Sequence, residues 1–355
     1  MEMTFRWYGK NDPVTLKNIR QIPGMKGIVT AIYDVPVGDE WPIERINELK
    51  MQIEDNGLKL SVIESVPVHE DIKLGKQTRD KYIENYQNTL RNLGKAGIET
   101  VCYNFMPVFD WTRTDLAYEL SDGSTALIFD EEVSKQMDPR TGKLALPGWD
   151  SSYTKEELSD LLNNYSNVDE EILWQNLGYF IKKIIPVAED AGVKMAIHPD
   201  DPPFSIFGLP RIITNKKNLD RFLNIYDSPF NGITMCSGSL GAIKENNFEE
   251  MLRYFLKKNR VNFVHARNIK LTGKRSFQES AHLSESGSID MYEVIKALSS
   301  ANYKGAIRPD HGRMIWGENG KPGYGLYDRA LGATYLNGLW EAVEKDKKER
   351  KKYDI

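Results

Sequence analysis

Four potential metal ligands stand at the ends of four short apolar runs, at spacings typical of one repeated supersecondary unit. They are His198, Cys236, His265 and Asp310, and they are separated by 38, 29 and 45 positions. A strand, a helix and their two connecting loops need at least about 30 residues. Each ligand would therefore end one of four successive strands of a parallel sheet. If that sheet is closed, all four meet at its carboxyl edge, where barrel enzymes have their active sites.

Eight candidate strands alternate with candidate helices along the whole chain. We expect the strands at 3–9, 27–35, 58–66, 99–106, 194–198, 232–236, 261–265 and 306–310. We expect the helices after Asp12 as N-cap, from Ile43, and near 82–96, 170–191, 217–226, 248–258 and 291–299. Strands rich in Val and Ile that alternate with helices indicate a parallel sheet buried on both faces. Eight such units favour an α/β fold of the (β/α)8 TIM-barrel type over an open sheet. No Gly-x-Gly-x-x-Gly turn follows the first strand, which disfavours dinucleotide binding.

The connection after the fourth strand is much longer than the others. It has 63 residues before the next expected helix and is rich in Pro and Gly. Loops beyond about 15 residues usually carry function or are disordered. This one contains aromatic residues such as Phe109, Trp111 and Trp149, which a disordered segment would lack. We predict one TIM-barrel domain over 1–355, with 107–168 as an insertion that forms a lid or a dimer contact.

Composition limits the possible binding partners of the protein and its cellular compartment. The net charge of −4 gives no reason to expect nucleic acid or an anionic membrane as a partner. No apolar run reaches the length of about 18 residues that crosses a bilayer, and the start at Met1 lacks the features of a signal peptide. The two cysteines, Cys102 and Cys236, argue against a disulfide scaffold. We therefore predict a cytoplasmic protein.

Each of the four candidate ligands has an ordinary structural alternative. His198 would then be a core histidine bonded to a carbonyl, Cys236 an inert buried thiol, and Asp310 an ion-pair partner of Arg308. His265 lies in polar company at a strand end, which favours a functional role. If these were four unrelated core residues, we would not expect all of them to be metal-binding residue types at the ends of successive strands. We predict a shared metal ion, for which this donor set suits Zn²⁺, Fe²⁺ or Mn²⁺.

Two residues near the last ligand are candidates for proton transfer. His311 follows Asp310 on the loop after the eighth strand, where it would act as a general acid or base or instead orient a ligand. Tyr324 lies between two glycines, which allow close approach of the backbone to a ligand, and its phenol can donate or relay a proton. Its alternative is an ordinary surface tyrosine in a turn.

Candidate substrate-binding residues lie at strand ends and on the loops that follow them: Arg6, Trp7, His69, Arg267, Asn268, His282 and Arg308. Arginine is expected where a carboxylate binds, because its guanidinium binds carboxylates with two hydrogen bonds. Tyr8 is a further candidate for the wall of the substrate pocket. The alternatives are a core position for Trp7, a helix cap for His69 and a surface position for His282.

Seven segments of the chain resemble the mannonate dehydratase family of xylose-isomerase-like barrels. They are FRWYG (5–9), VPVHEDIKLG (66–75), VCYNFMPVFDWTRTDL (101–116), MAIHPDDPP (195–203), HARN (265–268), AHLS (281–284) and RPDHGR (308–313). They are distributed over nearly the whole chain and are highly specific as a set.

The resemblance implies dehydration of D-mannonate, a small-molecule sugar acid, to 2-keto-3-deoxy-D-gluconate, in the breakdown of hexuronates. It implies Mn²⁺ or Fe²⁺ rather than Zn²⁺, held by the four ligands named above, and a homodimer. It also implies that His311 and Tyr324 form the acid–base pair. The alternatives are a metal-dependent sugar isomerase or epimerase on the same barrel, which a thiol ligand disfavours, and a sugar-acid binding protein with a structural metal.

Overall fold

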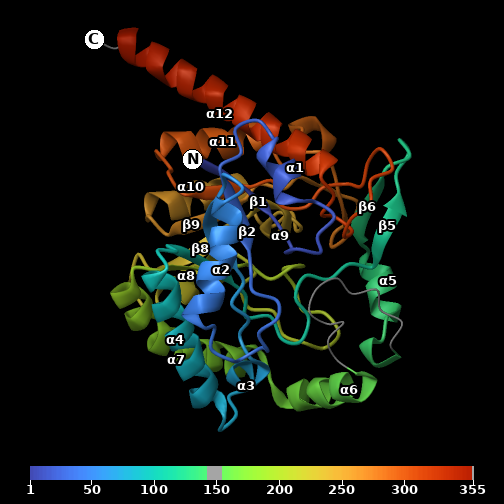
Figure 1. Cartoon of the computed structure of the whole chain (residues 1–355). Helices are drawn as coiled ribbons and strands as arrows, with labels where there is room; N and C mark the ends of the chain where they lie inside the picture. Colours follow the sequence, from blue (N-terminus) through green and yellow to red (C-terminus); the bar gives the residue numbers. More distant parts are fainter. Residues whose placement is uncertain (142–153, 354–355) are drawn as a thin grey trace.

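Eight parallel strands close into a barrel in the computed structural model, which describes residues 1–141 and 154–353 (Figure 1). In order around the barrel they are β1 (Glu2–Arg6), β12 (Ala306–Arg308), β9 (Val261–His265), β8 (Asn231–Cys236), β7 (Lys194–Ile197), β4 (Thr100–Tyr103), β3 (Lys59–Glu64) and β2 (Gly27–Thr30). All eight expected strands are present, and several end a few residues earlier than expected. The prediction of an α/β (β/α)8 TIM barrel is confirmed.

Helices connect the strands and cover the barrel. The longer ones are α2 (Ile43–Glu54), α4 (Arg79–Lys95), α7 (Glu170–Ala191), α8 (Lys216–Leu223), α10 (Phe248–Lys257), α11 (Met291–Ser300) and α12 (Tyr327–Tyr353). Asp169 caps α7 by accepting a hydrogen bond from the backbone N–H of Ile172, and Gly192 ends the helix in the left-handed conformation, as helix-capping rules expect. Figure 1 shows that α12 projects beyond the barrel towards the C-terminus.

The expected start of the first helix is wrong. Helix α1 (Leu16–Arg20) is capped by Thr15, whose hydroxyl accepts a hydrogen bond from the backbone N–H of Asn18. The Asp12 carboxylate instead accepts hydrogen bonds from the backbone N–H groups of Tyr8 and Val14. Asp12 therefore stabilises the turn before the helix, a role that aspartate performs as readily as capping.

A second sheet lies beside the barrel and was not expected from the sequence. Its four antiparallel strands, in spatial order, are β10 (Ile269–Leu271), β11 (Phe277–Glu279), β6 (Thr125–Phe129) and β5 (Asp115–Glu119). The connection between β4 and α7 thus contains half of this sheet, together with α5 (Glu131–Gln136) and α6 (Lys155–Asn164). Within the expected insertion 107–168, positions 142–153, including Trp149, lie outside the described residues.

The inside of the barrel is filled by apolar side chains, of which one is aromatic. Six strands each contribute one residue to this cluster: Val29, Val62, Cys102, Ala196, Phe263 and Ala306. The hydroxyl of Thr234 donates to the Cys102 Sγ at 3.2 Å, so this thiol is part of the packed interior. Among the described helices, none combines the length and the apolar character needed to cross a membrane.

Substitution of two glycines, one in α4 and one in α7, should change the stability of the protein in opposite directions. A Cβ at Gly94 would lie 2.3 Å from the backbone oxygen of Ala191, whereas a Cβ at Gly178 would have no atom within 4 Å. We expect Gly94→Ala to lower the free energy of unfolding by about 1–3 kcal/mol, because the two helices must separate. Gly178→Ala should raise it by about 0.5–1 kcal/mol, because glycine is unfavourable inside a helix. Urea unfolding measures both, and equal effects of the two changes would contradict this packing.

Candidate metal centre

A cavity of about 360 Å³ opens at the carboxyl ends of the barrel strands and among the residues that follow them. This volume is in the range of small-molecule binding sites. Its lining is mainly polar and charged: Arg6, Tyr8, Tyr33, Glu64, Ser65, Cys102, Tyr103, Asn104, Asp110, Trp111, His198, Asp201, Arg267, Arg308, Asp310, His311, Lys321 and Tyr324.

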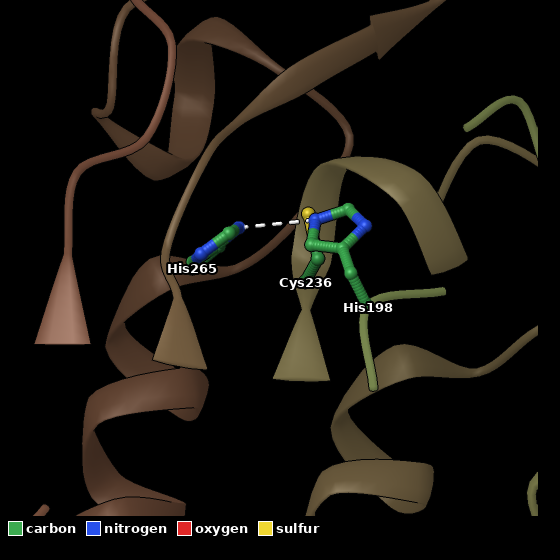
Figure 2. A group of neighbouring side chains, drawn as sticks. All are labelled: His198, Cys236 and His265. Carbon is green, nitrogen blue, oxygen red and sulfur yellow. Dashed lines mark hydrogen bonds between the residues drawn. The ribbon is translucent and has the colours of Figure 1, made fainter. Parts of the chain in front are cut away.

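Three of the four candidate ligands converge beside this cavity, and Figure 2 shows their side chains; of the three, only His198 is among the lining residues. Cys236 ends β8, His265 ends β9, and His198 follows the last residue of β7. One ligand atom from each lies within 4.8 Å of the others, and the His198 Nε2 is 3.1 Å from the His265 Nδ1. Because β7, β8 and β9 are neighbours in the barrel, their ends bring these side chains together.

Asp310 approaches the same group from β12. Its Oδ2 is 3.7 Å from the Cys236 Sγ, and its Oδ1 is 3.7 Å from the His265 Nδ1. Asp310 has a φ of 62°, a left-handed conformation that is uncommon for residues other than glycine. Although burial opposes ionisation, the guanidinium of Arg308 holds the pKa of the Asp310 carboxyl well below its usual range. The site therefore contains a buried carboxylate beside one thiol and two imidazoles.

The hydrogen bond that His198 makes outside this group fits a divalent ion. The His198 Nδ1 lies 2.6 Å from the backbone oxygen of Pro199, so Nδ1 carries the proton and the lone pair of Nε2 faces the other ligands. A donor set of imidazole, thiolate and carboxylate suits a transition metal or zinc ion. The side chains at this site thus fit the divalent metal ion that their residue types predict.

A second group of possible ligands consists of Glu64, Cys102 and His265. The positively charged guanidinium of Arg308 already lies among these residues. It donates hydrogen bonds to the His265 Nε2 and to the Glu64 Oε1, both at 3.0 Å. A metal ion there would have to displace this side chain. The group that contains His198 and Cys236 is therefore the better candidate.

His311 and Tyr324 lie side by side in the cavity. The His311 Nε2 is 2.8 Å from the phenol oxygen of Tyr324, so a proton can pass between them. Burial raises the pKa of Tyr324 well above its usual value and lowers that of His311. The phenol is thus protonated and the imidazole neutral near neutral pH. The indole of Trp111, from the connection after β4, packs against the His311 ring with 4.6 Å between ring centroids.

Of the seven candidates for substrate binding, three line the cavity, namely Arg6, Arg267 and Arg308, and the further candidate Tyr8 lines it as well. The Nη1 of Arg308 is buried and has no hydrogen-bond partner in the described part of the chain. A buried donor without a partner is costly, so this group is suited to bind an anionic oxygen of a ligand.

The other four candidates do not line the cavity. Trp7 is packed in the hydrophobic core. The His69 imidazole caps α3 (Glu70–Lys73) and stacks on Tyr82. The amide of Asn268 binds the backbone of the loop that follows β11. His282 lies 2.6 Å from the backbone oxygen of Pro309, so it supports the chain just before Asp310.

Several cavity residues were not identified from the sequence. Glu64 ends β3, and its place at the end of an expected strand could have marked it. Asp110 and Lys321 lie on connections whose paths cannot be inferred from periodicity. Behind His311 is a buried ionic cluster of Arg113, Asp201, Arg267 and Glu279, which depends on the unexpected second sheet.

Comparison with known proteins identifies the family. Residues 1–350 match the family described as D-mannonate dehydratase (UxuA). The mannonate dehydratase of Streptococcus uberis is 70% identical over 97% of this chain and 99% of that protein, and mannonate dehydratase 2 of Halalkalibacterium halodurans is 64% identical over 97% and 99%.

Solved structures agree with this match. The crystal structure of mannonate dehydratase from Streptococcus suis serotype 2 has a TM-score of 0.92 and 58% identity, covering 98% of this chain and 95% of that one. An L-ribulose 3-epimerase, at 13% identity and a TM-score of 0.56 over 98% and 97% of the two chains, shares the fold alone. The chain belongs to the D-mannonate dehydratase family and is a hydro-lyase.

Proposed function

We propose that this chain dehydrates D-mannonate to 2-keto-3-deoxy-D-gluconate in the cytoplasmic breakdown of hexuronates, with Mn²⁺ or Fe²⁺ as its metal. We further propose His198, Cys236, His265 and Asp310 as the ligands. Family membership supports the substrate and a divalent ion. The observation that carries the proposal is the convergence of three of these residues within 4.8 Å, next to the cavity that His198, Asp310, His311 and Tyr324 line.

The reaction removes a proton from C2 and the hydroxyl from C3 of the sugar acid. When bound, the divalent ion supplies a Lewis acid for the substrate's carboxylate and an adjacent hydroxyl. His311 and Tyr324 divide the two proton transfers: one accepts the C2 proton and the other protonates the departing C3 hydroxyl, which leaves as water. The enol that remains takes up the keto form at C2. The overall reaction is an elimination of water, so it needs neither an oxidant nor a reductant.

Charged and aromatic side chains of the cavity are suited to hold the substrate. The unpartnered Nη1 of Arg308 is a donor for the carboxylate, and Arg6 and Arg267 add positive charge to the wall. Trp111 covers one face of His311 and would keep water from the reacting atoms. This contact supports a lid function for the insertion 107–168.

We also propose a homodimer, with the insertion and the adjoining loop at the contact. Tyr118 and Val133 of the insertion are 45% and 47% exposed, and Trp316, on the loop that pairs with the insertion through Met314, is 74% exposed. Exposed apolar groups of this size often mark interaction sites. Sedimentation of Trp316→Ser should reveal a weakened dimer, and a wild-type monomer at micromolar concentration would contradict the proposal.

Changes of the acid–base pair should lower turnover without removing the metal. We expect His311→Ala and Tyr324→Phe each to lower kcat by about 10²–10⁴-fold, because each removes one proton transfer. The measurement is formation of the 2-keto-3-deoxy acid from mannonate, with metal content determined on the same samples. Near-normal turnover of His311→Ala with bound metal would show that the assignment is wrong, and an epimeric sugar acid as product would favour the epimerase alternative.

The two cysteines provide a matched test of the ligands. Loss of a partner that merely orients a ligand lowers metal affinity by about 10–100-fold. Cys236→Ser removes a ligand itself, so it should lower metal affinity by more than this. Cys102→Ser changes an equally buried thiol in the second candidate group and should keep the metal. Elemental analysis after dialysis measures both variants. Metal loss in Cys102→Ser but not in Cys236→Ser would place the ion in the other group.

A further inference from the structure

We propose that Glu279 is a positioning residue, which keeps the His311 ring in the tautomer that proton transfer requires. This inference rests on the proposed role of His311 in the reaction. Glu279 lies at the end of β11 in the second sheet, and its side chain is fully buried. Its Oε1 is 3.2 Å from the His311 Nδ1, on the opposite side of the ring from Tyr324, which is 2.8 Å from Nε2.

The positions of the two ring nitrogens determine what His311 can do. Nε2 faces the phenol of Tyr324 in the cavity, so it is the nitrogen that exchanges protons with substrate. As a base, Nε2 needs a free lone pair, and the proton of the neutral ring must then be on Nδ1. As an acid, the ring carries protons on both nitrogens. Either role therefore requires a proton on Nδ1 and an acceptor for it, and Glu279 provides that acceptor.

Arg267 favours the opposite tautomer. Its Nη1 lies 2.6 Å from the same Nδ1, and a guanidinium can only donate hydrogen bonds. If Arg267 were the only partner, Nδ1 would accept, the proton would move to Nε2, and the ring could not act as a base. The Glu279 carboxylate opposes this arrangement because its negative charge attracts a proton on Nδ1.

The surroundings of Glu279 direct one of its oxygens at His311. Oε1 also accepts from the Arg113 Nη2 at 3.0 Å and lies 3.3 Å from the Arg267 Nη1, while Oε2 has no hydrogen-bond partner among the described residues. Among the described residues, the hydrogen bonds and ion pairs of the carboxylate thus all use the oxygen that reaches the histidine. A purely structural ion pair would be expected to satisfy both oxygens, since unpaired buried oxygens are costly.

Arg113 connects this arrangement to the insertion. Its side chain is 0% exposed and bridges Glu279 and Asp201, while Trp111, two residues earlier, packs on the His311 ring. The insertion therefore contacts His311 directly through Trp111 and indirectly through Glu279. Two arginines and two carboxylates balance one another in this cluster, as buried charges must.

The tautomer can be observed directly by nitrogen NMR. The full chain is labelled with ¹⁵N-histidine and loaded with diamagnetic Zn²⁺, and the signals of His311 are assigned by their absence in His311→Gln. We expect a proton on Nδ1 in the wild type and a shift of the proton towards Nε2 in Glu279→Gln. The control is Asp201→Asn, which also removes a carboxylate partner of Arg113 and Arg267. Asp201 forms no hydrogen bond or ion pair with His311 in the described part of the chain, so the Nδ1 proton should stay.

Kinetics provide the second readout. We expect Glu279→Gln to lower kcat by at least about 100-fold with little change in KM, because a wrong tautomer impairs the chemical step and not binding. If His311→Ala is inactive while Glu279→Gln keeps its kcat and its Nδ1 proton, the inference is overturned and the proposed function stands. If His311→Ala keeps near-normal turnover, the proposed role of His311 fails, and if the metal-loaded wild type forms no 2-keto-3-deoxy acid from mannonate, the proposed function itself fails. Should Glu279→Gln not fold, a wild-type ring with its proton on Nε2 would still overturn the inference.

Discussion

Closure of the parallel sheet is the constraint on which the site depends. A closed barrel requires the carboxyl ends of all its strands to surround one opening. Because β7, β8 and β9 are consecutive around the barrel, the residues at their ends face one another without any special loop geometry. The imidazoles of His198 and His265 and the thiol of Cys236 meet for this reason, although long stretches of sequence separate them.

Buried charge around this opening is paired almost throughout. Arg308 neutralises Glu64 and Asp310, and Arg267 neutralises Asp201 and Glu279. Charges can be buried at this density only when each has a partner of opposite sign. The two arginines therefore fix the positions of a candidate metal ligand and of the residues behind His311. The same pairing leaves the Arg308 Nη1 as an open donor in the cavity.

The barrel and the candidate ligands could be predicted from the sequence, because both depend on local patterns. Apolar runs of strand length and amphipathic helices such as α7 leave periodic signals, and His198, Cys236 and His265 stand next to those runs. The second sheet could not be predicted, because its strands have three to five residues and its two halves join where β6 pairs with β11 across more than 140 positions of sequence. Arg113 and Glu279 acquire their roles through that pairing. Trp7 and His69 show a different limit of prediction from sequence: the position of a residue in a strand or loop does not reveal which way its side chain points.

The central claim is that four ligands share one ion at the mouth of the barrel. Anomalous scattering from a crystal of the holoenzyme, recorded on both sides of the manganese and iron absorption edges, locates and identifies that ion directly. The convergence of the strand ends predicts one peak within bonding distance of the His198 Nε2, the Cys236 Sγ, the His265 Nδ1 and the Asp310 carboxylate. A peak between Glu64 and Cys102, or an ion that Cys236 does not reach, would contradict it.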